Sequence, residues 1–244
     1  MQVKMKSNIY ILFFFIIVLL SSCNRRSGRL QSGNTKSKIE REFRDSERTI
    51  NLSSRPQQIM SGSQIFQKYN NAVFMVYTSD GSNIFQGSGF FVSSTGIAVS
   101  NYHVFKDTYI GLEVLKLPSG DNLQIEEVIA KDEKDDFIVF KVRAKEDQCF
   151  EYIPISLRSL SVGETVYTIG SPRGLENTFS SGEISQKRNN NIIQINAPID
   201  HGSSGGALID VYGEAIGITS GGRDDSGANL NYAIDIKVVR EILE

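Results

Sequence analysis

Short hydrophobic runs, separated by polar and turn-forming residues, recur along the chain from about residue 65 onward. The runs are rich in Val, Ile, Phe, Tyr and Thr, and Gly, Asn, Asp or Ser falls between them. β-Branched and aromatic residues in short runs bounded by turn residues are typical of strands. We therefore expect strands at residues 72–78, 84–92, 97–100, 112–117, 123–130 and 137–142, and then at 165–169, 178–186, 192–196, 207–209, 215–219 and 231–234.

Two stretches have a helical rather than a strand-like pattern. Residues 63–69 (SQIFQKY) predict a turn or two of capped helix, and residues 237–244 (KVVREILE) predict a short helix at the C-terminus. The strands fall into two sets of six, on either side of a join at about residues 145–154. Many short strands separated by turns favour an all-β barrel or sandwich.

The N-terminus has the pattern of an export signal. Lys4 and Lys6 precede an unbroken apolar run over residues 9–20, which is shorter than the roughly 20 residues that a membrane-spanning helix needs. The sequence Leu-Ser-Ser-Cys that ends at Cys23 resembles the bacterial lipobox. That resemblance implies a lipoprotein signal peptide at residues 1–22, cleavage before Cys23 and lipidation of its sulfur. An ordinary cleaved signal and an uncleaved anchor are the alternatives.

The residues that follow this signal form a polar segment. Residues 23–61 are rich in Arg, Ser, Asn, Gln and Lys. Such a segment buries too little apolar surface to offset the entropy of ordering, so we expect a flexible tether. If Cys23 carries lipid, Cys149 is the remaining cysteine and no intrachain disulfide can form. We expect Cys149 to be a small packing residue.

The sequence motif that most strongly suggests catalysis lies at residues 200–206, Asp-His-Gly-Ser-Ser-Gly-Gly. Glycines at this density are poor material for a strand or a helix, but they suit a sharp turn that directs backbone N–H groups into a concave space. Such amides can stabilise the oxyanion of a tetrahedral intermediate. Within Gly-x-Ser-Gly-Gly, Ser204 is the candidate nucleophile. A plain hairpin loop is the alternative interpretation.

A serine nucleophile needs a base, and the chain has two histidines. His201 lies three residues before Ser204 and belongs to the same turn, so His103 is the candidate base. Asp136 begins an apolar strand that can carry it inward, whereas Asp135 ends a solvated acidic turn. Asp136 is therefore the candidate carboxylate that orients the imidazole. The order His, Asp, Ser is that of chymotrypsin, and not of subtilisin or the α/β-hydrolases.

Several motifs in this order resemble the trypsin-like serine proteases, and more closely their Do/HtrA-type branch. They are Gly-Ser-Gly-Phe-Phe-Val at 87–92, Asn-Tyr-His-Val at 101–104, the strand at Asp136, Gly-Ser-Ser-Gly-Gly-Ala-Leu at 202–208, Gly-Glu-Ala-Ile-Gly-Ile at 213–218 and Asn-Tyr-Ala-Ile at 231–234. The resemblance covers about residues 65–236. It implies two six-stranded antiparallel barrels, at about 65–147 and 150–236, within a protease domain at 62–244 that has short helices at both ends.

The same resemblance implies roles for individual residues. The catalytic triad would be His103, Asp136 and Ser204, with an oxyanion hole at Gly202, Ser203 and Ser204 in which the amides of Gly202 and Ser204 donate. The substrate pocket would be lined by Ile199, Ile218, Thr219, Ser220 and Gly221. No acidic residue lies at its base, so we expect a small or medium aliphatic P1 residue rather than Arg or Lys.

Two departures from the family pattern limit what the resemblance implies. Ser203 precedes the nucleophile, where digestive trypsins have the Asp that pairs with a newly cut N-terminus, so activation by such a cut is not expected. Most members of the branch carry PDZ domains after the protease. The chain ends soon after the last expected strand, and we expect no PDZ domain here.

The sequence as a whole predicts a serine endopeptidase that hydrolyses exposed or unfolded protein segments. It would be exported and lipid-anchored to the bacterial cell envelope, on its periplasmic or outer face. The alternative is a latent or inactive binding protein on the protease fold; an esterase is disfavoured because no nucleophile elbow Gly-x-Ser-x-Gly lies between a strand and a helix. The 244 residues carry a net charge of −2, so no nucleic-acid partner is expected. No cofactor or metal is expected, and the oligomeric state stays open.

Overall fold

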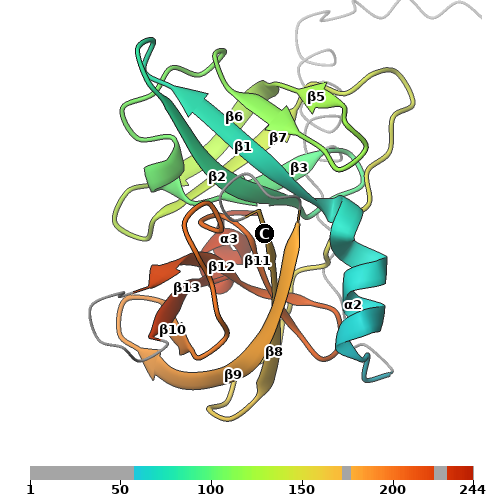
Figure 1. The fold of residues 1–244 in the computed structure, drawn as a ribbon, viewed down its shortest axis with the longest axis vertical. Helices are drawn as coiled ribbons and strands as arrows, with labels where there is room; N and C mark the ends of the chain where they lie inside the picture. Colours follow the sequence, from blue (N-terminus) through green and yellow to red (C-terminus); the bar gives the residue numbers. More distant parts are fainter. Residues whose placement is uncertain (1–57, 172–176, 223–229, 244) are drawn as a thin grey trace, which may run out of the picture. The chain divides into compact units, whose positions relative to one another are not determined.

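The computed structural model describes residues 58–171, 177–222 and 230–243. They form two antiparallel β-sheets, with strands β1 to β7 in the first half and β8 to β13 in the second (Figure 1). The predicted all-β fold is confirmed. The predicted signal peptide with Cys23, and the predicted tether as far as residue 57, lie outside the described residues. Within the described residues, no helix has the length and hydropathy needed to cross a membrane.

The first sheet contains seven strands in the order β5-β4-β1-β2-β3-β7-β6. Neighbouring strands pair in register, as in Val73 opposite Phe90 and Val99 opposite Val139. The strands are β1 (Val73–Ser79), β2 (Ile84–Phe91), β3 (Ile97–Ser100), β4 (Val114–Lys116), β5 (Asn122–Leu123), β6 (Ile125–Asp132) and β7 (Phe137–Val142).

The two edges of the first sheet meet at Gln124. This residue alone separates β5, at one edge, from β6, at the other, and consecutive Cα atoms lie only about 3.8 Å apart, so the sheet must curl until its edges come together here. The single strand expected at 123–130 is divided here, because Leu123 pairs with Leu115 of β4 whereas Ile125 pairs with Val142 of β7. The Gln124 carbonyl accepts the Arg143 N–H at 2.9 Å, next to the β7 pair. The buried carboxylate of Glu113 accepts the Ile125 N–H at 2.8 Å. The expected six-stranded first barrel is therefore a curled seven-stranded sheet with two unpaired edges.

The second sheet closes into the predicted six-stranded barrel. Its order is β10-β13-β12-β11-β8-β9, and the first and last strands also pair, since Ile192 lies opposite both Ile234 of β13 and Arg188 of β9. A register shift between Thr219 and Gly221 marks a bulge in β12. The strands are β8 (Thr165–Gly170), β9 (Thr178–Arg188), β10 (Ile192–Ile195), β11 (Ala207–Asp210), β12 (Ala215–Gly222) and β13 (Asn231–Asp235).

Short helices lie at both ends of the described chain, as predicted. Helix α2 (Gly62–Tyr69) begins at a capping box in which Ser61 Oγ accepts the Gln64 N–H and Gln64 Oε1 accepts the Ser61 N–H. This exchange satisfies amides that would otherwise have no helical partner. The other helical segments are the single 3₁₀ turns η1 (Asn70–Ala72) and η2 (Tyr102–Val104), and the C-terminal helix α3 (Lys237–Leu243).

Successive residues of the same strand pack into different apolar clusters. In β7, Val139 packs against residues of both halves, whereas Phe140 packs within the first half. In β11, Ile209 joins the same shared cluster, whereas Leu208 packs inside the barrel. This follows from the two-residue period of a strand, which directs alternate side chains to opposite faces. The shared cluster also takes in both terminal helices, through Ile65, Val238 and Val239, and the linker between β7 and β8 (residues 143–164), through Ile153 and Ile155.

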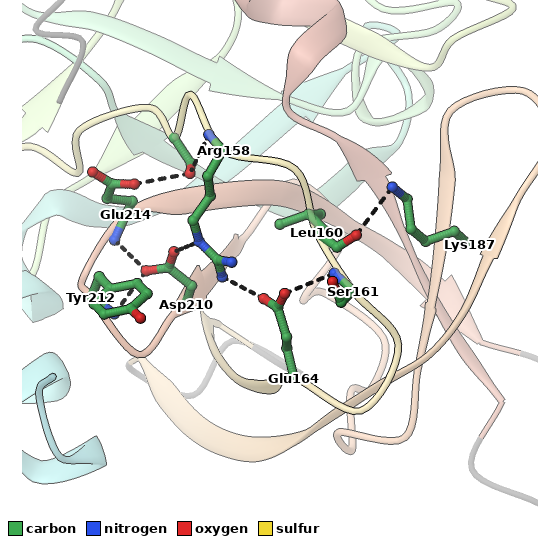
Figure 2. Close-up of polar contacts among 9 residues, drawn as sticks. Arg158, Leu160, Ser161, Glu164, Lys187, Asp210, Tyr212 and Glu214 are labelled. Carbon is green, nitrogen blue, oxygen red and sulfur yellow. Dashed lines mark hydrogen bonds and ion pairs between the residues drawn. The ribbon is translucent and has the colours of Figure 1, made fainter. Parts of the chain in front are cut away.

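A buried polar network fastens the linker to the hairpin between β11 and β12 (Figure 2). Arg158 Nε donates to Asp210 Oδ2 at 2.8 Å, and its Nη2 donates to Glu164 Oε2 at 2.5 Å. The other oxygen of the fully buried Asp210 accepts the N–H groups of Tyr212 and Glu214, which closes the hairpin. The linker and the far end of the hairpin are thus held together.

The same contacts perturb two ionisation equilibria. Burial alone would lower the pKa of the Arg158 guanidinium, but its hydrogen bonds to Glu164 and Asp210 outweigh burial and raise that pKa. Burial alone would raise the pKa of Glu164, but the hydrogen bond and charge of Arg158 outweigh burial and lower it. Both groups are therefore held in their charged forms in the folded protein.

Cys149 does not pack as expected. Its side chain is exposed in the linker, and the buried position is taken by the next residue, Phe150. The Phe150 ring stacks on Phe91 with the ring centres 4.4 Å apart. The prediction that Cys149 is a packing residue was wrong because an aromatic neighbour buries more apolar surface at the same turn of the chain.

Candidate active site

His103 and Asp136 lie side by side on the first sheet. His103 is on η2, directly after β3, and Asp136 directly precedes β7, the strand that pairs with β3. His103 Nδ1 lies 2.9 Å from Asp136 Oδ2, and the His103 backbone N–H donates to Asp136 Oδ1 at 2.9 Å. An ionised carboxylate can only accept, so this contact puts the proton of a neutral imidazole on Nδ1. Nε2 then keeps a lone pair that can accept a proton.

The backbone of Asp136 has a left-handed conformation that directs its side chain toward η2. Its φ is +47°, a region that Asp tolerates better than most residues. The fully buried side chain of Asn101 donates from Nδ2 to the Asp136 carbonyl at 2.9 Å. The neighbouring Asp135 is directed elsewhere, since its Oδ1 accepts from Asn191 Nδ2 at 3.2 Å. Of the two adjacent carboxylates, the structure brings Asp136 to the histidine.

Ser220 adds a contact from the barrel. Its Oγ donates to Asp136 Oδ2 at 2.9 Å. Ser220 lies at the bulge in β12, and a bulge adds a residue whose side chain is redirected. Ser220 was predicted to line the substrate pocket, and its contact with Asp136 was not predicted, because nothing in the local sequence marks the bulge. The Asp136 carboxylate thus accepts hydrogen bonds from both halves of the protein.

Residues 200–206 form a tight turn, called here the 200–206 turn. The Ser203 N–H donates to the Asp200 carbonyl at 2.9 Å, and Gly202 has a φ of +92° while that of His201 is not positive. These features define a type II turn with Gly202 at its third position. The Ser203 amide is therefore engaged inside the turn and cannot donate to an oxyanion, whereas the predicted donors are the amides of Gly202 and Ser204. Within the described part of the chain, the amides of Gly202 and Ser204 have no acceptor.

The turn and the histidine meet across strand β2. The Ser88 N–H donates to the Ser204 carbonyl at 2.7 Å. At Gly87, an added Cβ would lie 2.7 Å from the methyl groups of Val104 and 3.1 Å from the Ser204 carbonyl oxygen. Gly87 therefore lies between η2, the segment of His103, and the turn that contains Ser204. Among the described residues, no hydrogen bond joins Ser204 Oγ to the imidazole, and such bonds are often long in the absence of substrate.

The residues predicted to line the substrate pocket differ in how far their side chains are exposed. Ile218 is fully buried in the shared cluster, and Thr219 is 1% exposed, so neither side chain offers a surface to a substrate. Ser220 contacts Asp136, and Ile199 is half-buried. At Gly221, a built Cβ would meet no described atom within 4 Å, so β12 borders open space there. The expectation that Ile218 forms part of the pocket was wrong, because the alternation of β12 turns it toward the core.

The fold and this arrangement of groups define a class of protein. The chain belongs to the family described as the trypsin-like peptidase domain, which matches residues 87–218, just over half of its length. Among solved structures, it is similar to the serine endoprotease from Yersinia pestis, with a TM-score of 0.66 and 28% identity. That match covers 77% of this chain and 68% of the other.

Curated relatives point to one branch of the family. The chain is 34% identical over 172 residues to a probable periplasmic serine endoprotease, DegP-like, of Bartonella henselae, a match that covers 65% of this chain and 33% of the relative. It is 35% identical over 173 residues to the mitochondrial serine protease HTRA2 of Bos taurus, covering 66% of this chain and 36% of the relative. The chain spans about a third of the length of these relatives.

Proposed function

We propose that this chain is a serine endopeptidase that cleaves peptide bonds in exposed or unfolded protein segments. The observation that carries the proposal is the contact of His103 Nδ1 with Asp136 Oδ2 at 2.9 Å, together with a turn at Ser204 in which two amides have no acceptor among the described residues. A base with an oriented lone pair, a hydroxyl beside it and donors for an oxyanion are the groups that acyl transfer needs. The two relatives described above are both named as serine proteases, which supports the same activity.

In the proposed mechanism, Ser204 Oγ attacks the carbonyl carbon of the substrate. A C–O bond forms, the Ser204 proton passes to His103 Nε2, and negative charge develops on the carbonyl oxygen opposite the amides of Gly202 and Ser204. Asp136 stabilises the imidazolium, and Ser220 holds the carboxylate in place. The imidazolium then gives its proton to the leaving amine as the C–N bond breaks. Water hydrolyses the acyl-enzyme through the same groups.

The proposal includes a location in the cell envelope. DegP-like relatives that are named periplasmic support export of this chain. In the proposed arrangement, residues 1–22 are removed, Cys23 carries lipid, and residues 23–61 hold the protease domain of 62–244 away from the membrane. Growth of cells with a labelled fatty acid tests the anchor: the parent protein is expected to incorporate the label, and Cys23→Ser is not. A parent protein that carries no label would exclude the lipid anchor.

A fluorophosphonate probe, which reacts with activated serines, tests the catalytic role of Ser204. We expect labelling of the purified chain, and cleavage of an unfolded protein substrate, to be lost in Ser204→Ala. The adjacent Ser203→Ala is a matched control, because it removes a hydroxyl one residue away and keeps the proposed nucleophile. Labelling that survives in Ser204→Ala would contradict the assignment.

One observation favours a second candidate, a latent protein on the same fold. No hydrogen bond joins Ser204 Oγ to His103 among the described residues, so the resting turn could require a partner to align it. A folded parent protein that neither reacts with the probe nor cleaves the substrate, alone, would support this second function.

A further inference from the structure

Three consecutive carbonyl groups of the 200–206 turn each accept a hydrogen bond from outside the turn. Ser88 Oγ donates to the Gly202 carbonyl at 2.7 Å, Thr219 Oγ1 donates to the Ser203 carbonyl at 2.7 Å, and the Ser88 N–H donates to the Ser204 carbonyl at 2.7 Å. Two of these donors are side-chain hydroxyls. They come from opposite halves of the protein, Ser88 from β2 and Thr219 from β12.

Holding a carbonyl group also fixes the direction of the next amide. A trans peptide is planar, and its C=O and N–H point in opposite directions. Because Thr219 holds the Ser203 carbonyl, the Ser204 N–H of the same peptide is directed away from Thr219. Because Ser88 holds the Gly202 carbonyl, the Ser203 N–H is directed to Asp200, where it makes its 2.9 Å hydrogen bond. The two hydroxyls thus act on the orientation of the turn without reaching a substrate.

Ser88 is buried, and hydrogen bonds to its neighbours hold its side chain and its backbone in place. It is fully buried, and its Oγ accepts the Ser171 N–H at 2.9 Å while it donates to Gly202. Its carbonyl accepts from Ser100 Oγ at 2.7 Å. Every polar atom of Ser88 is therefore paired, and its contacts reach β3, the end of β8 and the turn. Loss of the hydroxyl would leave the Gly202 carbonyl and the Ser171 N–H without this partner.

We propose that Ser88 and Thr219 are positioning residues that clamp the carbonyl side of the 200–206 turn: Thr219 directs the Ser204 amide toward the oxyanion, and Ser88 fixes the preceding peptide, whose Ser203 amide closes the turn on Asp200. The inference rests on the proposed peptidase function and deepens it. Donors that meet charge developing in the transition state act mainly on kcat, so loss of the clamp lowers kcat while KM changes little. Ser88 has the larger effect, because the Ser203 carbonyl keeps a second donor, the Gly206 N–H at 2.9 Å, when Thr219 loses its hydroxyl.

The test compares four variants of the full chain. Ser88→Ala and Thr219→Val remove the two hydroxyls, and Thr219→Ser restores one of them without the methyl group. Ser156→Ala is the matched control: Ser156 is 2% exposed, its Oγ donates to Glu214 Oε2 at 2.9 Å, and it accepts the Arg158 N–H at 3.4 Å. The Ser156→Ala replacement removes a buried hydroxyl of the same kind, but at the far end of the β11–β12 hairpin.

The first measurement does not depend on activity. Hydrogen exchange of the backbone amides, followed by mass spectrometry, is expected to be faster over residues 200–206 in Ser88→Ala and Thr219→Val than in the parent protein. Thr219→Ser and Ser156→Ala are expected to match the parent there. Exchange in the turn that is unchanged in both Ser88→Ala and Thr219→Val would overturn the clamp, even if the parent protein proves inactive.

The second measurement addresses the catalytic consequence. We expect kcat on a peptide substrate to fall at least about tenfold in Ser88→Ala and less in Thr219→Val, with KM within about twofold of the parent. A peptide boronic acid, whose boron forms a tetrahedral adduct with the serine, is expected to lose affinity in proportion to kcat/KM. Proportional loss in Ser156→Ala as well would show a general effect of stability and overturn the proposal. If the parent protein reacts with neither the probe nor the substrate, the proposed peptidase function is wrong. The hydrogen-exchange data would then be the only test of whether Ser88 and Thr219 hold the turn.

Discussion

The side-chain amide of Asn101 donates to the backbone carbonyl of Asp136 at 2.9 Å, and so joins the segment that carries the candidate base to the carboxylate that orients it. Asn101 is fully buried two residues before His103, and Asp136 has a φ of +47°. A left-handed conformation at a non-glycine residue persists only when its surroundings hold it. The contact therefore supports the backbone from which the carboxylate reaches the imidazole.

Removal of this support is expected to lower activity. In Asn101→Ala, the left-handed conformation of Asp136 loses its donor, and strain of order 1 kcal/mol is no longer offset. Since about 1.4 kcal/mol corresponds to a factor of ten, kcat is expected to fall roughly tenfold. Steady-state kinetics on a peptide substrate give this value. Asn191→Ala is the control, because its amide donates to Asp135 instead; an equal loss in both variants would contradict a specific role for Asn101.

Replacement of the orienting carboxylate is expected to have a larger effect. In Asp136→Asn, the amide can donate to Nδ1 and favour the wrong tautomer, so that Nε2 no longer accepts the serine proton. In proteases of this geometry, the corresponding change lowers kcat by about 10⁴. Asp135→Asn retains the charge at Asp136 and is expected to keep most of the activity. If the two variants lost activity equally, the choice between the adjacent carboxylates would be wrong.

The turn also depends on a glycine that faces the first sheet. Gly205 has a φ of +89°, and an added Cβ would lie 2.1 Å from the Ser88 carbonyl oxygen and 2.3 Å from Ser100 Oγ. Gly205→Ala is therefore expected to lower the free energy of unfolding by both backbone strain and overlap. Gly120→Ala isolates the strain, since Gly120 has a φ of +90° with no atom within 4 Å of the added Cβ.

The difference between these two alanine variants measures the overlap alone. Left-handed strain costs about 1–2 kcal/mol, and we expect Gly205→Ala to be destabilised by roughly a further 1–3 kcal/mol, as for overpacked sites. Urea denaturation gives both free energies of unfolding. Equal destabilisation of the two variants would mean that the 200–206 turn can move away from β2.

The ion pair between Arg158 and Glu164 predicts a loss of stability in acid. The pKa of Glu164 is lower in the folded protein than its ordinary value of 4.5, so the unfolded chain binds the proton more readily. The stabilisation is therefore fully present above about pH 4.5 and is lost as the pH falls through the lower, folded pKa. Urea midpoints between pH 6 and pH 3 are expected to fall less steeply in Glu164→Gln than in the parent. Glu183→Gln, an exposed site on β9, is the control, and a parent-like slope in Glu164→Gln would contradict the pairing.

Much of the fold could be predicted because each strand carries its own signal. The strands at residues 97–100 and 137–142 have the bounds found in the structure, since both runs are apolar or small apart from Lys141 and are bounded by polar residues and turns. The break at Gln124 had no such signal. It depends on a hydrogen bond from Arg143 and on the buried Glu113, which lie far from it in the sequence.

The candidate site, like the fold, could be predicted from the sequence only in part. His103 and Asp136 could be named from the sequence because each adjoins an apolar strand, and adjacent strands bring them together. Two other contacts could not be predicted from the sequence, because each joins one half of the protein to the other. They are the hydrogen bond from Ser220 to Asp136 and the hydrogen bond from Ser88 to the turn. The inward direction of Ile218 was missed because a strand in a barrel that packs on a second sheet is buried on both faces.

The cluster of apolar side chains that both halves share has a consequence for folding. It draws on β7, β11, the linker and both terminal helices, so neither half alone could cover it. We infer that the described region unfolds as one cooperative unit despite its two sheets. A single proteolytic nick in the exposed linker, at residues 143–147, would then leave two fragments that stay associated and share one melting transition.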